Sequence, residues 1–303
     1  MKNEFFHQSV LLNEAVDLVL NPVFQKDIII VDATAGGGGY SELICTKLKK
    51  NFRLICLDKD INALSYSSNR LRNFSENIFF VNNNFTNIVQ ILKKLNLNYI
   101  NGIVFDLGLS SYQLNSEDGF SFMKDTSLDM RADSRDNLNA ADVLNSYSKN
   151  SLIKFFSEFG EIGNAQRLAK KITETRKKKK FKTTFDLVNA VKEEYKLPDK
   201  KSYKFLAKIF QALRIEVNNE LENLQNALEE SYNCLLPGGR IVAVSYHSLE
   251  DRIVKNYFKS KTEDEINVNR FKILTKKPLM PAYAEIKSNP RSRSAKLRSA
   301  EKI

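Results

Sequence analysis

The sequence predicts a doubly wound α/β fold, and the prediction depends on two features of residues 27–108. Short apolar runs typical of strands alternate there with segments of helical periodicity. The strand-like runs, among them "DIIIVDA" and "INGIVFDLG", are almost continuously apolar, as expected for parallel strands covered on both faces. We therefore expect a parallel sheet with helices packed against both of its faces.

The predicted elements follow one another in a regular order along the chain. Strands are expected at residues 27–33, 52–58, 77–82 and 100–108, with helices at 40–50, 61–73 and 85–96. The alternation stops at a Ser- and Asp-rich loop, residues 112–137, and helical patterns such as 141–160 and 183–195 follow. It resumes with one long amphipathic helix at 203–235, the turn "LPGG" and a strand at 240–247. We therefore expect residues 115–214 to form a helical insertion in an α/β domain made of 1–114 and 215–303.

Positive charge is concentrated in two segments of the chain. Residues 149–214 hold 18 Lys and Arg against 7 Asp and Glu, and residues 270–303 hold 10 against 2, which gives net charges of +11 and +8. Because the whole chain carries +11, the remainder sums to −8. A polyanionic partner would account for this segregation, and the inserted region is then the predicted substrate-binding domain. Solvated Lys-rich helices would account for it equally well.

Cysteines and apolar segments indicate a cytoplasmic protein without disulfides or metal. The first 20 residues lack the basic start and long uncharged apolar run of a signal peptide, and no segment approaches the roughly 20 apolar residues of a bilayer span. Cys45, Cys56 and Cys234 lie in apolar patterns and form no CxxC or Cys/His cluster. We expect them to be core residues.

Four consecutive glycines, residues 36–39, separate the first strand from the following helix. Such a turn lets an anionic ligand group approach the backbone and a helix N-terminus. The G-x-G-x-x-G/A fingerprint of dinucleotide-binding proteins does not fit, because Ser41 or Glu42 takes the last position, and the Lys of a P-loop is absent. A ligand without a triphosphate is favoured.

Acidic residues end two of the predicted strands at the same edge of the sheet. Asp58 lies about 20 residues beyond the glycines, where doubly wound folds place the acid that binds a ribose diol, and Asp106 ends the fourth strand. S-adenosylmethionine has such a ribose, no phosphate, and a carboxylate that suits a glycine loop. Each acid alone would be read as a helix cap or a solvated residue, but together they favour a nucleotide-like ligand.

Seven stretches of the chain resemble, in order, the motifs of the ribosomal RNA small subunit methyltransferase H family, also called MraW. They are "HQSVLLNEAV", "DATAGGGGYS", "DLGLSSYQL", "GFSFMKDTSLDMR", "QALRIEVNNEL", "LPGGRIVAVSYHSLEDRIVK" and "NPRSRSAKLR". The resemblance spans nearly the whole chain. It implies a Rossmann-like fold and N4-methylation of one cytidine in the decoding region of bacterial small-subunit (16S) rRNA, with S-adenosylmethionine as donor. The implied partner is this rRNA or an assembling small subunit, with no membrane, and the oligomeric state, a homodimer included, stays open.

The same resemblance implies which residues bind the donor. Its cofactor contacts fall on Gly38, Gly39, Tyr40, Asp58, Phe85, Asp106 and Gln113. Many members read Phe-Gly-Arg-Gly-Gly-His where this chain has residues 35–40, so we expect contacts made by backbone to be kept, whereas a histidine side-chain role is in doubt. From the residues alone, Phe85 would rather begin the core of the next helix, and Gln113 would be a solvated loop residue.

Two residues are candidates for catalysis of methyl transfer. Asp106 is the first, because it ends the fourth strand beside the expected methyl position, although it would equally serve as a pure donor ligand. His247 is the second, because it ends the predicted strand 240–247 at the same edge, although a structural role is the simpler interpretation. No metal ligand set is expected.

Other interpretations of the chain remain open at this point. One is methylation of a DNA adenine or a protein side chain, although the Asp/Asn-Pro-Pro-Tyr/Phe signature is absent after the fourth strand, which reads "DLGLSS". Another is an inactive RNA-binding or assembly factor, against which the intact Asp58 and Asp106 argue. The run "RKKKK" at 176–180 and the cations of "NPRSRSAKLR" suit RNA phosphates, but they would also suit a solvated helix face and a closing strand.

Overall fold

The protein is represented by a computed structural model that describes residues 9–20, 27–108, 117–262 and 270–303. The chain divides into two compact units. The sheet unit comprises Met1–Ser110 and Leu221–Ile303, and the helical unit comprises Ser111–Glu220. The predicted insertion, 115–214, has boundaries within a few residues of the helical unit.

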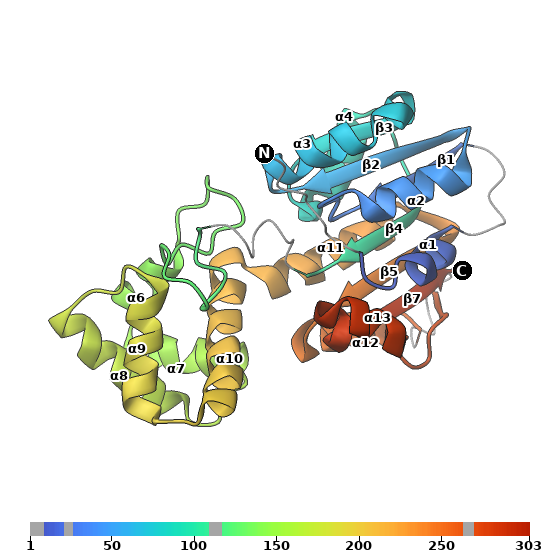
Figure 1. The fold of residues 1–303 in the computed structure, drawn as a ribbon. Helices are drawn as coiled ribbons and strands as arrows, with labels where there is room; N and C mark the ends of the chain where they lie inside the picture. The colour runs from blue at the N-terminus through green and yellow to red at the C-terminus, as the bar shows by residue number, and fades with distance from the viewer. Residues whose placement is uncertain (1–8, 21–26, 109–116, 263–269) are drawn as a thin grey trace. The chain divides into compact units, whose positions relative to one another are not determined.

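A seven-stranded sheet forms the centre of the sheet unit (Figure 1). Its strands are β1 (Ile28–Asp32), β2 (Phe52–Asp58), β3 (Ile78–Asn82), β4 (Ile100–Asp106), β5 (Leu235–Ser245), β6 (Phe271–Ile273) and β7 (Lys296–Lys302). They lie in the order β3-β2-β1-β4-β5-β7-β6. The first five in this order are parallel, whereas β7 pairs antiparallel with β5 and β6. Since the chain runs outward from β1 to β3 and then returns to β4 on the other side of β1, the order reverses between β1 and β4, where open α/β sheets form a ligand crevice.

Helices cover both faces of the sheet, and this confirms the predicted doubly wound class. Side chains of β1 alternate between two cores: Ile28 and Ile30 pack on one face, Ile29 and Val31 on the other. The first core is completed by α1 (Leu12–Val19), α2 (Gly39–Leu48) and α3 (Ile61–Arg70), and the second by α4 (Ile88–Lys94), α11 (Glu220–Cys234) and α12 (Ser248–Ser260). Burial on both faces explains why the strand sequences are continuously apolar rather than alternating.

Short elements complete the connections of the sheet unit. They are the 3-10 turns η1 (Arg72–Asn77), η2 (Phe85–Asn87) and η3 (Pro290–Ser294), and helix α13 (Tyr283–Ser288). The three cysteines are buried and free, as predicted for core residues. Among the described residues, no helix combines the length and apolar character of a bilayer span.

Within residues 117–219, the helical unit contains five helices and the loop that precedes them. The helices are α6 (Ala140–Ser146), α7 (Lys149–Glu158), α8 (Ala165–Lys178), α9 (Thr184–Tyr195) and α10 (Asp199–Asn218). Each buries an apolar stripe, for example Leu168 and Ile172 on α8. Capping boxes begin α6 at Asn139 and α9 at Thr183, which explains why these helices start where the polar loops end.

The prediction of a single long helix at 203–235 is wrong, because the helix is interrupted at Asn219. That residue has φ 49°, a left-handed conformation that Asn tolerates, and it separates α10 from α11. The preceding Asn218 is buried: its amide nitrogen donates to the carbonyls of Met130 and Arg214, and its side-chain oxygen accepts from the N–H of Ala132. The amphipathic pattern continues across the break, so periodicity alone does not reveal it.

The strand predicted at 240–247 also differs from the structure. β5 begins earlier, at Leu235, with an irregular register between Ile100 and Gly102 of β4, and it ends at Ser245. His247 is therefore the N-cap of α12 rather than the last residue of a strand. The physical reason is Glu250, whose carboxylate accepts the backbone N–H groups of Tyr246 and His247 and turns the chain into the helix.

Candidate active site

The glycine loop connects β1 to α2, and its glycines are needed for reasons internal to the chain. Gly36 and Gly38 have φ +48° and +76°, which side chains rarely adopt. A Cβ on Gly39 would lie 2.1 Å from the hydroxyl oxygen of Ser9. Close packing against Ser9, together with turn geometry, therefore accounts for part of the pattern that the sequence attributed to a ligand.

Asp58, at the end of β2, is bonded directly to this loop. Its Oδ2 accepts the backbone N–H of Gly36 at 2.8 Å, and its Oδ1 accepts that of Asp60 at 2.9 Å. Burial raises the pKa of Asp58 to about 6 despite these two bonds. Each carboxylate oxygen retains a second lone pair, so the group has acceptor capacity left for a ribose diol.

Asp32, at the end of β1, lies fully buried beneath the loop. Its Oδ2 accepts the hydroxyl of Ser41 at 2.6 Å, and its Oδ1 accepts the N–H of Thr34 at 3.3 Å. Burial raises the pKa of this carboxyl to about 6, and the nearby Asp58 acts in the same direction. Asp32 thus joins the loop to the first turn of α2.

Asp106, at the end of β4, completes a row of three acids along the carboxyl edge of the sheet. Its backbone N–H donates to Oγ1 of Thr34 at 2.7 Å, and its Oδ1 accepts the hydroxyl of Tyr246 at 2.8 Å. Burial raises the pKa of Asp106 to about 7, which the Tyr246 hydrogen bond opposes and the neighbouring Asp32 and Glu250 reinforce. Burial therefore moves the ionisation of Asp106 from the acidic range toward neutral pH.

The other predicted donor ligands differ in how they are placed. The hydroxyl of Tyr40 donates to the carbonyl of Val10 in the core, and burial raises the pKa of Tyr40 well above its usual range, so only its backbone is available for a ligand. Phe85 is half-buried and packs edge-on against Phe105, with ring centroids 5.6 Å apart. Gln113 lies outside the described residues. These assignments stay predictions.

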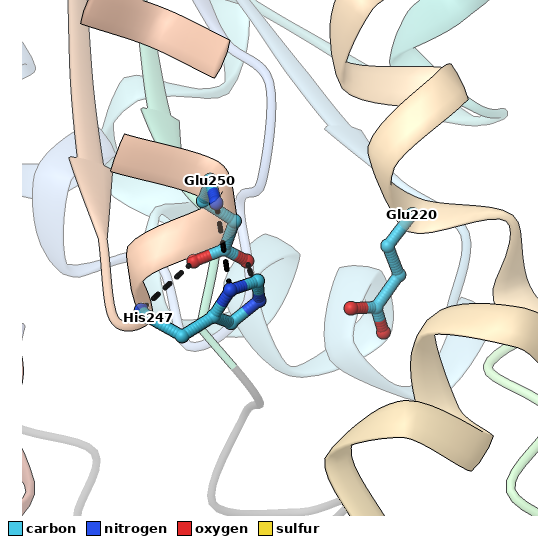
Figure 2. A group of neighbouring side chains, drawn as sticks. All are labelled: Glu220, His247 and Glu250. Carbon is cyan, nitrogen blue, oxygen red and sulfur yellow. Dashed lines mark hydrogen bonds and ion pairs between the residues drawn. The ribbon is translucent and has the colours of Figure 1, made fainter. Parts of the chain in front are cut away.

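His247 and Glu250 form a reciprocal cap at the start of α12 (Figure 2). The ring Nδ1 of His247 accepts the backbone N–H of Glu250 at 3.4 Å, and Nε2 lies 3.1 Å from Oε1 of Glu250. Glu250 is buried and His247 is half-buried. Figure 2 also draws Glu220, which belongs to the helical unit. His247 therefore has a structural role, and its catalytic role stays a prediction.

Three residues at this edge were not identified by sequence reasoning: Asp32, Tyr246 and Glu250. Asp32 could have been noticed as the acid that ends the first strand, directly before the glycine loop. Glu250 stands three residues after His247, the spacing of a capping box. Nothing in the sequence signals that the hydroxyl of Tyr246 meets Asp106, because 140 positions separate them.

The basic segments are partly used in structural contacts. In the run 176–180, Arg176 donates to the carbonyls of Leu144 and Tyr147, and Lys179 pairs with Asp186 at 2.7 Å. Lys177, Lys178 and Lys180, which belong to the same run, are all exposed.

The sequence allowed two interpretations of the C-terminal tail, contacts to RNA phosphates and a closing strand. The structure has a closing strand there, β7. Arg298 lies on β7, is buried, and bonds Asp251 at 2.6 Å, with Lys296 3.2 Å from the same carboxylate. Burial opposes ionisation of Asp251, but these two cations outweigh it and hold its pKa below the usual value. Arg291 and Arg293 belong to η3 instead.

These features indicate what kind of protein this is. A parallel sheet with a glycine turn after β1, an acid at the end of β2 and a further acid at the end of β4, all beside the point where strand order reverses, is a doubly wound enzyme that binds a nucleoside-containing ligand. The chain belongs to the MraW methylase family, whose model matches residues 4–303. It is a methyltransferase of the class that takes its methyl group from S-adenosylmethionine.

The chain is similar to curated proteins over almost its full length. It is 42% identical to "Ribosomal RNA small subunit methyltransferase H" of Clostridioides difficile, over 99% of this chain and 100% of the relative. It is 44% identical to the protein of the same name from Sulfurihydrogenibium sp., over 98% and 99%. Among solved structures, a Streptococcus mutans protein in complex with SAH is 13% identical, with a TM-score of 0.48, and the match covers 98% of this chain and 100% of that one.

Proposed function

We propose that this protein transfers a methyl group from S-adenosylmethionine to the N4 amine of one cytidine in the decoding region of small-subunit rRNA, in the cytoplasm. The substrate rests on the two relatives, which are 42% and 44% identical over nearly their full length and are named for small-subunit rRNA. The acids at the ends of β2 and β4 support the chemistry.

The residues of this edge fit the donor. The carboxylate of Asp58 offers its remaining lone pairs to the ribose diol, while its bond to Gly36 fixes the loop beside it. Backbone groups of Gly38, Gly39 and Tyr40 would contact the methionine part. Phe85 would pack against the adenine, and Gln113 is the remaining proposed contact.

Asp106 is the proposed catalytic group. When bound, S-adenosylmethionine supplies an electrophilic methyl group on a sulfonium. The cytosine amine is conjugated with its ring and is a weak nucleophile, so it needs alignment and an acceptor for its N–H groups as positive charge develops. Ionised Asp106 provides that acceptor. As the nitrogen–carbon bond forms and the carbon–sulfur bond breaks, the sulfur keeps the electron pair and the amine proton passes to Asp106 and then to water.

His247 is a second candidate for the proton, because it follows the end of β5 at the same edge of the sheet. Its Nδ1 accepts from the α12 backbone, so the proton of the neutral ring lies on Nε2, 3.1 Å from Oε1 of Glu250, and His247 could take up a further proton only at Nδ1 by giving up the cap. We regard it as subordinate to Asp106 in the transfer step.

The helical unit and its basic segment are proposed to hold RNA through phosphates. Lys177, Lys178 and Lys180 are the best-placed cations of the run 176–180, since the other two cations of that run make structural contacts.

One experiment tests the whole proposal. The protein is incubated with labelled S-adenosylmethionine and three substrates from cells lacking the activity: naked small-subunit rRNA, assembling subunits and finished subunits. Label in N4-methylcytidine at one decoding-region position supports the proposal, and the preferred substrate identifies the assembly state. Label in adenine, in DNA or in protein would contradict it, and failure to bind the donor would indicate an inactive RNA-binding factor.

A further inference from the structure

Tyr246 contacts the proposed catalytic acid, Asp106, directly. Tyr246 has no assigned role in the sequence analysis or in the proposed mechanism. It lies between the end of β5 and the start of α12. Its hydroxyl donates to Oδ1 of Asp106 at 2.8 Å. A hydrogen bond to a carboxylate both limits rotation of the group and favours its ionised form.

The position of Tyr246 is fixed from two sides. Its backbone N–H donates to Oε2 of Glu250 at 2.9 Å, so the cap of α12 holds its main chain. Its ring packs against Gly108, where an added Cβ would lie only 2.7 Å from the ring carbon Cε2. A tyrosine held in this way presents its hydroxyl at one place, beside the end of β4.

The hydroxyl of Tyr246 stays a donor over the whole useful pH range. Burial and the neighbouring Asp106 raise the pKa of Tyr246 well above its usual value. It therefore cannot take the proton of the acceptor amine, because its own proton remains bound and is engaged by Asp106. Its effect on the reaction has to pass through that carboxylate.

The hydrogen bond from Tyr246 matters because the other groups around Asp106 also affect whether Asp106 is ionised. The titratable groups that act on it are Asp32 from β1, Tyr40 from α2, and Tyr246 and Glu250 from the start of α12. The acids among them oppose ionisation, as does burial, whereas the Tyr246 hydroxyl and the backbone of Gly108 favour it. A carboxylate has about four lone-pair sites, so these two donors leave capacity for an incoming N–H group.

We propose that Tyr246 is a positioning residue for methyl transfer, which orients the carboxylate of Asp106 and keeps it ionised so that it can accept the N–H groups of the acceptor amine. This inference rests on the proposed role of Asp106 and deepens it.

The test is the single-turnover rate as a function of pH in the full-length protein with saturating S-adenosylmethionine. For Tyr246→Phe we expect the midpoint of the rise in rate to move up by about one pH unit, a tenfold change in the acid dissociation constant. The rate should fall by up to about fivefold at pH 7 and recover toward that of wild type at high pH, with the donor dissociation constant at pH 8.5 within about twofold. Tyr257→Phe on α12, where the tyrosine ring packs against Phe271, is the matched control and should leave the profile unchanged.

Further arms separate Tyr246 from Asp106. In an Asp106→Asn background, adding Tyr246→Phe should not slow the reaction further, because the target of the hydrogen bond is gone. If Tyr246→Phe does not fold, 3,5-difluorotyrosine placed at 246 strengthens the donor at nearly the same shape, and the midpoint should move down. A folded Tyr246→Phe variant with the wild-type profile, or one in which only donor affinity changes, overturns the inference. A wild-type rate in Asp106→Asn instead overturns the proposed catalytic role of Asp106.

Discussion

Asp58 is expected to dominate donor affinity, because it is a charged acceptor that is also bonded to the glycine loop. Asp58→Ala should weaken S-adenosylmethionine binding by about 1.5–3 kcal/mol, the cost of losing a hydrogen bond to a charged group. Calorimetry measures this. Asp58→Asn is the control, since it keeps an acceptor for Gly36 but loses the charge. If Asp58→Ala weakens donor binding and Asp58→Asn does not, Asp58 acts by ordering the glycine loop and not by contacting the diol.

Asp106 is expected to control the chemical step through its ionisation. Because the pKa of Asp106 in the donor-free protein is about 7, and a bound sulfonium favours the ionised form, the single-turnover rate should rise with pH with a midpoint at or below about 7. Asp106→Asn should be slow at all pH values and lack this rise. If instead only the donor dissociation constant increases, Asp106 is a ligand and not a catalytic group.

His247 can be tested for chemistry separately from capping. His247→Ala removes the N-cap of α12 and should cost about 1 kcal/mol of unfolding free energy. We also expect slower methyl transfer with nearly normal donor binding. His247→Asn restores a good cap without the imidazole. Recovery of the rate in the Asn variant would show that His247 acts only by starting the helix.

At the scale of elements, the cations of the basic run at the end of α8 differ in their roles. Arg176 closes the C-terminal end of α6 and Lys179 pairs with the first turn of α9, so these two cations hold helices together. Replacing Lys177, Lys178 and Lys180 with Ala should lower the salt dependence of RNA binding. The log–log slope should fall by about 0.7–0.9 for each phosphate that the variant no longer neutralises.

Two controls accompany this triple variant. Donor affinity should not change, since none of these three lysines is among the proposed donor contacts. Lys179→Ala alone should affect stability more than the salt slope, because its charge is engaged by Asp186. An unaltered slope in the triple variant would make these lysines a solvated helix face.

At the scale of the whole molecule, the buried acids make stability depend on pH. The pKa of Asp32 is about 6 in the folded protein against 3.8 when exposed, so the folded state binds its proton more tightly. Its contribution to the unfolding free energy is complete below about pH 4 and is lost as pH rises through 6, on the order of 3 kcal/mol.

Asp32→Asn removes this titration. Relative to wild type, the variant should therefore become progressively more stable between about pH 4 and pH 6, because its uncharged amide has no cost of ionisation in the core. Urea unfolding at several pH values measures the difference. A stability difference that does not vary with pH would mean that Asp32 titrates normally.

The fold class, the family and the positions of Asp58 and Asp106 could all be predicted from the amino-acid sequence. Strands buried on both faces need continuous apolar residues, and parallel strands joined by helices bring Asp58 and Asp106 to one edge, so both conclusions follow from local pattern. The family follows from motifs that are themselves contiguous, such as "SYHSLEDR".

How these residues are used depends instead on tertiary packing. The break at Asn219 depends on Asn218 reaching Met130, the cap at His247 depends on Glu250, and the packing at Gly39 depends on Ser9. The hydrogen bond from Tyr246 to Asp106 likewise joins two strand ends that lie 140 positions apart. A sequence pattern reports which face of an element is buried, but the partner of a buried polar group is set by the packing of distant segments, which local periodicity does not encode.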